Sequence, residues 1–183
     1  GPVAAMEAGD YVAAAEELRG IVSQDSSNVQ ALRLLGSAYM HLGVPLQAIQ
    51  VCRAVATVDS TDAGIKTVLG FLYFQQGAFE EAELYYRQAI IKDPRQVQAY
   101  QGLGWIYLQR HQLQEALDMV TRTTEQAPNY APNYVLMGRV LTGQGFFENA
   151  KNAYQRAFVL DPKLRDRYGI LLQELVLRHW LIR

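Results

Sequence analysis

Apolar residues recur along the chain at the three- and four-residue spacing of an amphipathic helix, in short segments separated by tight turns. In residues 97–110, for example, Tyr100, Leu103 and Tyr107 fall on one helical stripe. A second helical segment follows each such stripe after a short turn. The pattern predicts pairs of antiparallel helices that bury their apolar stripes against each other.

The whole chain divides into segments of this kind, and no segment shows the two-residue alternation of a strand. Prolines fall at or near the predicted helix starts, where their missing N–H is tolerated. The fold is therefore predicted as all-α. The expected helices cover residues 3–8, 11–24, 29–42, 45–58, 63–76, 79–92, 97–110, 113–126, 131–144, 147–160 and 164–182.

Small residues recur every 34 positions. One series lies inside the first helix of each pair, where close helix packing favours glycine: Gly36, Gly70, Gly104 and Gly138. A second series lies at the turn between the two helices: Gly9, Gly43, Gly77 and Gly145, with His111 in the remaining place. Loops that cradle phosphates also use glycines, but they do not recur at a fixed interval, so both series indicate a repeat architecture.

This pattern resembles the tetratricopeptide repeat, a 34-residue unit with Leu-Gly, Tyr, Ala, an aromatic residue, Ala and Pro at set places. One unit here carries Leu69-Gly70, Tyr73, Ala82, Tyr86, Ala89 and Pro94. The resemblance implies a right-handed superhelical solenoid of antiparallel helix pairs with a C-terminal capping helix. A single solenoid over residues 3–182 is expected, with repeats at 3–28, 29–62, 63–96, 97–130 and 131–164 and the final helix at 164–182. Gly1 and Pro2 resemble the remnant of a cleaved tag.

Charge and composition limit the classes of partner, cofactor and location that the chain can have. The formal net charge is −1 and the pI is near 6.3, which argues against a nucleic-acid partner. The one cysteine, Cys52, allows neither an internal disulfide nor a thiolate zinc cluster, and no cofactor is expected. No apolar run is long enough to span a membrane. A cytoplasmic location is expected, with a periplasmic or membrane-anchored one as the alternative if the natural N-terminus has been removed.

No catalytic constellation emerges from the sequence, and no enzymatic activity is predicted. The three histidines, His41, His111 and His179, are far apart in a linear stack of repeats. Cys52 falls at a position that other repeats fill with core residues, so it is interpreted as a small core residue.

The face of each first helix that points away from its partner is the candidate binding surface. In the family this face lines a concave groove that binds peptides. Here its centre is apolar and aromatic, with an arginine at each end: Arg33, Met40, Phe71, Phe74, Trp105, Leu108 and Arg139. Two interpretations stand: a groove for a partner protein, or side chains that pack on one another. The lysines and asparagines of the family's chaperone-tail clamp are missing from it.

The last helix carries apolar residues nearly all round. Tyr168, Leu171 and Leu175 have the spacing that would dock it on the last repeat. We expect this to leave Leu172, Val176 and Trp180 on another face, whereas a terminal cap normally has a polar outer face. These three residues are candidates for self-association or for a contact with another partner.

The sequence thus predicts a protein-interaction scaffold, of a bacterial type by its glutamine- and arginine-rich composition, that binds a protein or peptide segment. The alternatives are a chaperone or assembly factor of a bacterial secretion, pilus or organelle system such as a magnetosome, and the repeat region of a larger enzyme or membrane-anchored protein. An RNA-binding helical repeat would need a basic face, which the near-neutral charge does not favour.

Overall fold

The computed structural model describes the backbone of residues 1–182 and the side chains up to Arg178. Within this range all regular structure is helical, which confirms the all-α prediction. The chain divides into two compact units, Gly1–Gln96 and Val97–Arg183, and the boundary falls between two predicted repeats. The expectation of one continuous solenoid over residues 3–182 stays a prediction.

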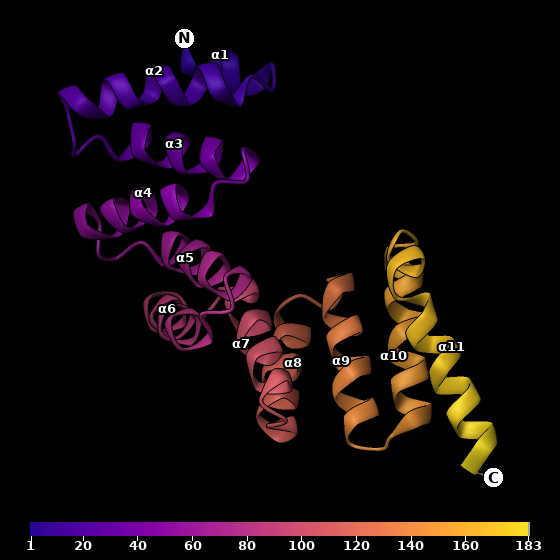
Figure 1. Cartoon of the computed structure of the whole chain (residues 1–183). Coiled ribbons are helices and arrows are strands. Elements are labelled where there is room, and N and C mark those ends of the chain that lie inside the picture. The colour runs from indigo at the N-terminus through magenta and orange to yellow at the C-terminus, as the bar shows by residue number, and fades with distance from the viewer. Residues whose placement is uncertain (183) are drawn as a thin grey trace. The chain divides into compact units, whose positions relative to one another are not determined.

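The first unit is a stack of helices joined by short turns (Figure 1). It contains α1 (Pro2–Glu7), α2 (Tyr11–Gln24), α3 (Val29–His41), α4 (Pro45–Val58), α5 (Ala63–Gln75) and α6 (Phe79–Lys92). Each helix packs on the next one along the chain. The helix bounds agree with the predicted bounds to within about one residue.

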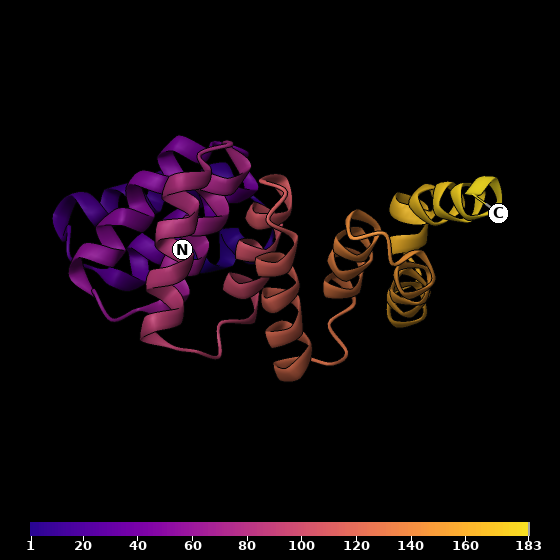
Figure 2. The same ribbon diagram turned by 90° about the horizontal axis from the view of Figure 1, so that it is seen from below.

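The second unit continues the pattern with α7 (Val97–Gln109), α8 (Leu113–Gln126), α9 (Ala131–Gly143), α10 (Phe147–Leu160) and α11 (Leu164–Ile182). Helix α11 lies on α10 and also contacts α9 (Figure 2). Its Leu175 is buried in the same apolar cluster as Val135, Tyr154 and Phe158. The predicted docking of the last helix on the last repeat is therefore confirmed.

The helices begin and end for local reasons. Asp10, Asn28 and Asp62 each accept a hydrogen bond of 3.0 Å from a backbone N–H in the first turn of the following helix. The turns within the pairs require a left-handed backbone, with φ of +67° at Gly43 and +58° at His111. His111 thus takes the place of the turn glycine, as predicted, although its side chain makes the left-handed conformation costly.

Gly70 and Gly138 inside the first helices make room for the second helix of their own pair, whereas Gly104 makes room chiefly for Leu136 of α9, the first helix of the next repeat. A Cβ at Gly70 would lie only 2.5 Å from the ring of Tyr86, and one at Gly138 only 2.7 Å from the ring of Tyr154. Cys52 on α4 takes the place of Tyr86 in the preceding repeat and is buried, as predicted. Close packing of paired helices is thus built from a glycine on one side and a large or medium side chain on the other.

One packing position departs from the expectation. Lys66 lies on the apolar stripe of α5 and is buried, whereas other repeats place Leu32 and Tyr100 at this point. Its four-carbon stem can cover apolar surface while its ammonium group reaches outward.

Candidate functional site

Two hollows in the surface collect most of the predicted groove residues. The first, the unit 1 hollow, has a volume of about 280 Å³ and lies beside the turn between α3 and α4. Met40 and Phe71 are 39% and 43% exposed, which leaves large apolar side chains open to solvent at its wall. The hollow is lined by Met40, Gly43, Val44, Pro45, Phe71, Leu72, Gln75 and Gln76.

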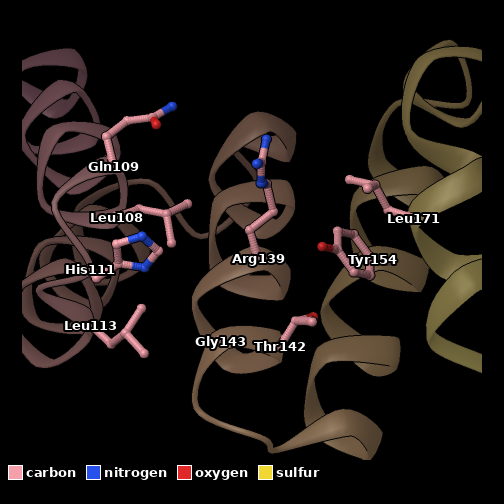
Figure 3. A pocket seen from close by; sticks show the side chains of 9 residues that line it. All are labelled: Leu108, Gln109, His111, Leu113, Arg139, Thr142, Gly143, Tyr154 and Leu171. Atoms are coloured by element: carbon pink, nitrogen blue, oxygen red, sulfur yellow. The ribbon is translucent and has the colours of Figure 1, made fainter. Parts of the chain in front are cut away.

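The second, the unit 2 hollow, has a volume of about 370 Å³ and lies along α9. Figure 3 shows Leu108 and His111 on one side of α9, Tyr154 and Leu171 on the other, and Arg139 rising from α9 between them. The hollow is lined by Leu108, Gln109, His111, Leu113, Arg139, Thr142, Gly143, Tyr154 and Leu171.

The two hollows occupy the same place in the repeat. Met40 and Leu108 are 68 residues apart, as are Phe71 and Arg139, and this separation is two periods of the 34-residue repeat. The same backbone geometry therefore builds both hollows, and the side chains give them different chemistry. The unit 1 hollow presents an aromatic ring where the unit 2 hollow presents a guanidinium group.

Arg139 is held by an aromatic neighbour. Its guanidinium carbon lies 5.3 Å from the centre of the Trp105 ring, a cation–π contact that fixes where the charge is presented. Trp105 itself is half-buried and does not line the hollow. Trp105 and Arg139, both predicted to lie in the groove, therefore act together.

Two hydroxyl groups beside Arg139 are already partnered. The Thr142 hydroxyl donates to the Gly138 carbonyl at 2.7 Å. Burial raises the pKa of Tyr154, while a hydrogen bond with Thr142 and the charge of Arg139 act in the opposite direction. The Tyr154 hydroxyl is therefore neutral and tied to Thr142.

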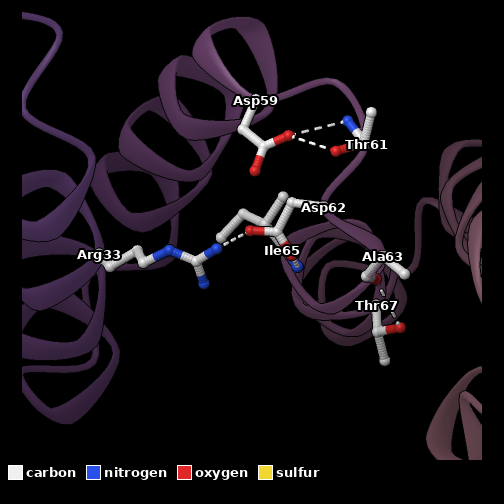
Figure 4. Close-up of polar contacts among 7 residues, drawn as sticks. All are labelled: Arg33, Asp59, Thr61, Asp62, Ala63, Ile65 and Thr67. Atoms are coloured by element: carbon white, nitrogen blue, oxygen red, sulfur yellow. Dashed lines mark hydrogen bonds and ion pairs between the residues drawn. The ribbon is translucent and has the colours of Figure 1, made fainter.

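Arg33 has a different place from the one expected for a groove residue. Its guanidinium forms an ion pair with Asp62, whose other oxygen caps α5 by accepting from the Ile65 N–H (Figure 4). The predicted free charge at this end of the groove is thus used to tie α3 to the start of α5. Corresponding polar contacts, also between residues 29 apart, join Thr67 to Gln96 and Gln101 to Tyr130, each at 3.0 Å.

Phe74 also departs from the expectation, because it lines neither hollow. It is half-buried, and its ring lies 5.4 Å from the ring of Phe79 in a tilted arrangement. This contact favours the interpretation that Phe74 packs within its own repeat. The placement of Phe71 and Trp105 in one groove stays a prediction, since these residues belong to different units.

The predicted association face of the last helix is only partly present. Leu172 packs against the cluster around Leu175, because residues 168, 171, 172 and 175 form one helical stripe. Its expected placement on a separate, free face was wrong. Val176 is 39% exposed, and the side chain of Trp180 lies outside the described residues.

Catalytic and metal chemistry find no support in the described part of the chain. No group of three His, Cys, Asp or Glu residues there is arranged to hold a metal ion. Burial raises the pKa of the Cys52 thiol to about 11, so the thiol is neutral and unreactive. Across the same residues, none of the helices combines the length and the apolarity that a membrane crossing requires.

Sequence reasoning missed the residues that the second helices and α11 contribute to the unit 2 hollow, Tyr154 and Leu171. Leu171 was assigned to the docking stripe of the last helix, and Tyr154 falls at the core position that Cys52 holds in an earlier repeat, yet both line the hollow. The turn residue His111 was recognised only as a substitute for glycine. Its occurrence in a glycine position was the available signal, since strained backbone is often found at functional sites.

Comparison with known proteins gives a consistent family. Tetratricopeptide repeat models match residues 3–63, 73–140 and 131–164. No curated protein sequence matches the chain.

Solved structures similar to the chain show the same fold. A crystal structure of MamA has a TM-score of 0.79 at 24% identity and covers 90% of this chain and 96% of that chain. Residues 41 to the end of MamA from Desulfovibrio magneticus RS-1 give 0.72 at 22%, with 82% and 85% covered. YrrB, described as a TPR protein with an unusual peptide-binding site, gives 0.71 at 18%, with 88% and 83% covered.

Proposed function

Because the chain belongs to the tetratricopeptide repeat family, we propose that it is a non-catalytic scaffold that binds a segment of a partner protein at its two hollows. The observation that carries this proposal is the exposure of Met40 and Phe71 at the wall of the unit 1 hollow. Each hollow is small, so it accommodates one or two side chains of a bound segment rather than a folded domain. The composition and the apolar lining favour a protein partner over a nucleic acid.

The energetics of such a contact are favourable. Burying an apolar side chain is worth about 1.5–3 kcal/mol, and exposed aromatic residues in a hollow are common anchors of protein interfaces. The packing stripes of α3 and α5 are already filled by Leu35 and Leu69, so Met40 and Phe71 are not needed for the core.

Selection from a displayed library of random dodecapeptides tests this proposal. The parent chain is expected to enrich peptides with apolar or aromatic residues, and the double variant Met40→Ser with Phe71→Ser is expected to lose them. The matched control is Leu84→Ser with Ile91→Ser, which removes two exposed apolar side chains from α6, outside the hollow. Circular dichroism checks that all three proteins keep their helicity. Equal binding by the two double variants would contradict the proposed site.

We further propose self-association through the outer face of α11. Ile170, Val176 and Leu177 are 62%, 39% and 63% exposed, and a two-fold contact could bury them in both copies. Sedimentation should then show a dimer at micromolar concentration that Val176→Glu with Leu177→Glu returns to monomer. A parent chain that sediments as a monomer at high concentration would exclude this association.

A further inference from the structure

We propose that the unit 2 hollow binds the carboxylate of an internal Asp or Glu side chain in the partner segment, with apolar residues of that segment on either side. This inference rests on the proposed function and assigns the hollow a specific ligand chemistry. It is carried by the charge of Arg139 and by the residues that surround it.

Arg139 is a positively charged side chain with no carboxylate beside it among the residues that line the hollow. Among the nine residues that line the hollow it is the one with a permanent charge, and no acidic residue lines the hollow with it. Within the described residues it has no ion pair, whereas Arg33 is paired with Asp62 and Arg95 with Asp93. Its side chain is exposed, and the Trp105 ring holds the guanidinium in place. A guanidinium offers several N–H donors in one plane and can pair with both oxygens of a carboxylate.

The walls of the hollow strengthen such a pair. Leu108 and Leu171 lie on either side of Arg139, and Leu113 lines the other end of the hollow beside Gly143 (Figure 3). A bound segment would displace water from these walls, and an ion pair is stronger where water is displaced. The same leucines would contact apolar neighbours of the acidic residue, so the hollow selects an acid in an apolar context.

An internal side chain fits this hollow better than a terminal carboxylate. A chain terminus bound by a protein is usually held by several donors. Here the Thr142 hydroxyl already donates to the Gly138 carbonyl, and the Tyr154 hydroxyl is hydrogen-bonded to Thr142. Gln109 and His111 can still donate beside Arg139, but the lysines and asparagines with which the family holds a terminal carboxylate are missing, so a single side-chain carboxylate that reaches in from a segment lying across the hollow fits better.

The charge of the second half of the chain is complementary to an acidic segment. Residues 97–183 contain ten Arg or Lys and seven Asp or Glu, while residues 1–96 contain seven and eleven. An acidic segment therefore approaches a half of the chain that carries an excess of positive charge, which favours the encounter of opposite charges.

The experiment uses the full chain and a library of random dodecapeptides displayed between two constant linkers, so that no free terminus is offered. The parent chain is expected to enrich Asp or Glu next to Leu, Ile, Val or Phe. Arg139→Gln should remove this acidic preference while the chain still binds apolar peptides through the unit 1 hollow. Arg122→Gln on α8 is the matched control, because it removes an equal charge from an exposed position outside the hollow.

Fluorescence anisotropy with one enriched peptide then measures the pairing directly. Exchange of its acidic residue for the amide should weaken binding to the parent chain about tenfold, since charge-assisted hydrogen bonds have this strength. The same exchange should have almost no effect on binding to Arg139→Gln. Binding of the acidic peptide should also weaken as salt is raised.

The outcomes separate this inference from the proposed function. Peptides that bind through Met40 and Phe71 but show no Arg139-dependent acidic preference would overturn the inference and leave the scaffold function standing. Binding only by peptides with a free C-terminus, in a parallel library that offers one, would also overturn it. A parent chain that enriches no peptide in either library would overturn the scaffold function and the inference together.

Discussion

Exchange of Gly70 for alanine tests the packing between the two helices of a repeat. A Cβ at this position would lie 2.5, 2.7 and 2.9 Å from three carbons of the Tyr86 ring. Ordinary carbon contacts are about 3.5–4.0 Å, so the ring or the backbone must move by roughly 1 Å. Tyr86 is buried, and its ring has little freedom to move away.

Gly36 provides the comparison within the same unit. A Cβ there would lie 3.3 Å from the sulfur of Cys52, the residue that stands in the place of Tyr86. That contact needs only a small adjustment, and alanine gains about 1 kcal/mol over glycine in a helix interior. We expect Gly36→Ala to leave the free energy of unfolding unchanged or to raise it by up to about 1 kcal/mol.

For Gly70→Ala the overpacking cost of about 1–3 kcal/mol exceeds the helical gain. After the helical gain of about 1 kcal/mol is subtracted, the expected net loss is up to about 2 kcal/mol, measured by urea unfolding followed by circular dichroism. A second background tests whether the ring is the cause. Tyr86→Val copies Val120 of the fourth repeat, and in this background Gly70→Ala should cost at least about 1 kcal/mol less than it does in the parent chain. Equal effects of alanine at Gly36 and Gly70, or full additivity with Tyr86→Val, would refute the argument.

Three further predictions concern single residues. His111→Gly should raise the free energy of unfolding by about 1 kcal/mol, because glycine adopts the φ of +58° without strain, and a lower urea midpoint would contradict this. Hydrogen bonds from Arg95 lower the pKa of Asp93 from 3.8 to about 2, so their stabilisation is complete above about pH 4 and is lost as the pH falls towards 2. Unfolding of Asp93→Asn should therefore depend less on pH in that range than unfolding of the parent. Cys52 should not react with Ellman's reagent at pH 8 until the chain unfolds, given its pKa of about 11, and rapid reaction of the folded chain would contradict its burial.

The periodic features of this molecule could be predicted from the sequence because they depend on backbone spacing. The glycine at position 70 and the turn residue at position 111 are fixed by the helix pair itself: the glycine recurs in four of the repeats and the left-handed turn residue in all five. The helix bounds could be predicted for the same reason. Met40 and Leu108 were placed in the candidate surface by the same periodicity.

The features that depend on the reach of a side chain could not be predicted in this way. Arg33 was assigned to the groove because its position on α3 faces away from α4, yet its long side chain reaches Asp62. Phe74 was assigned by the same rule and instead lies on Phe79. A signal for the Arg33 contact was present, since each of the three pairs 29 residues apart is polar, but no helical stripe connects their members.

These pairs have a consequence for the inheritance of the repeats. Arg33 meets Asp62 as an ion pair, Thr67 meets Gln96 as a hydroxyl–amide contact, and Gln101 meets the phenol of Tyr130. Both members of each pair lie within one repeat, 29–62, 63–96 or 97–130, so loss, duplication or reordering of whole repeats would keep every pair intact. Recombination with a breakpoint inside a repeat would preserve the backbone spacing but exchange the partners, for example by placing Gln96 opposite Arg33 in place of Asp62.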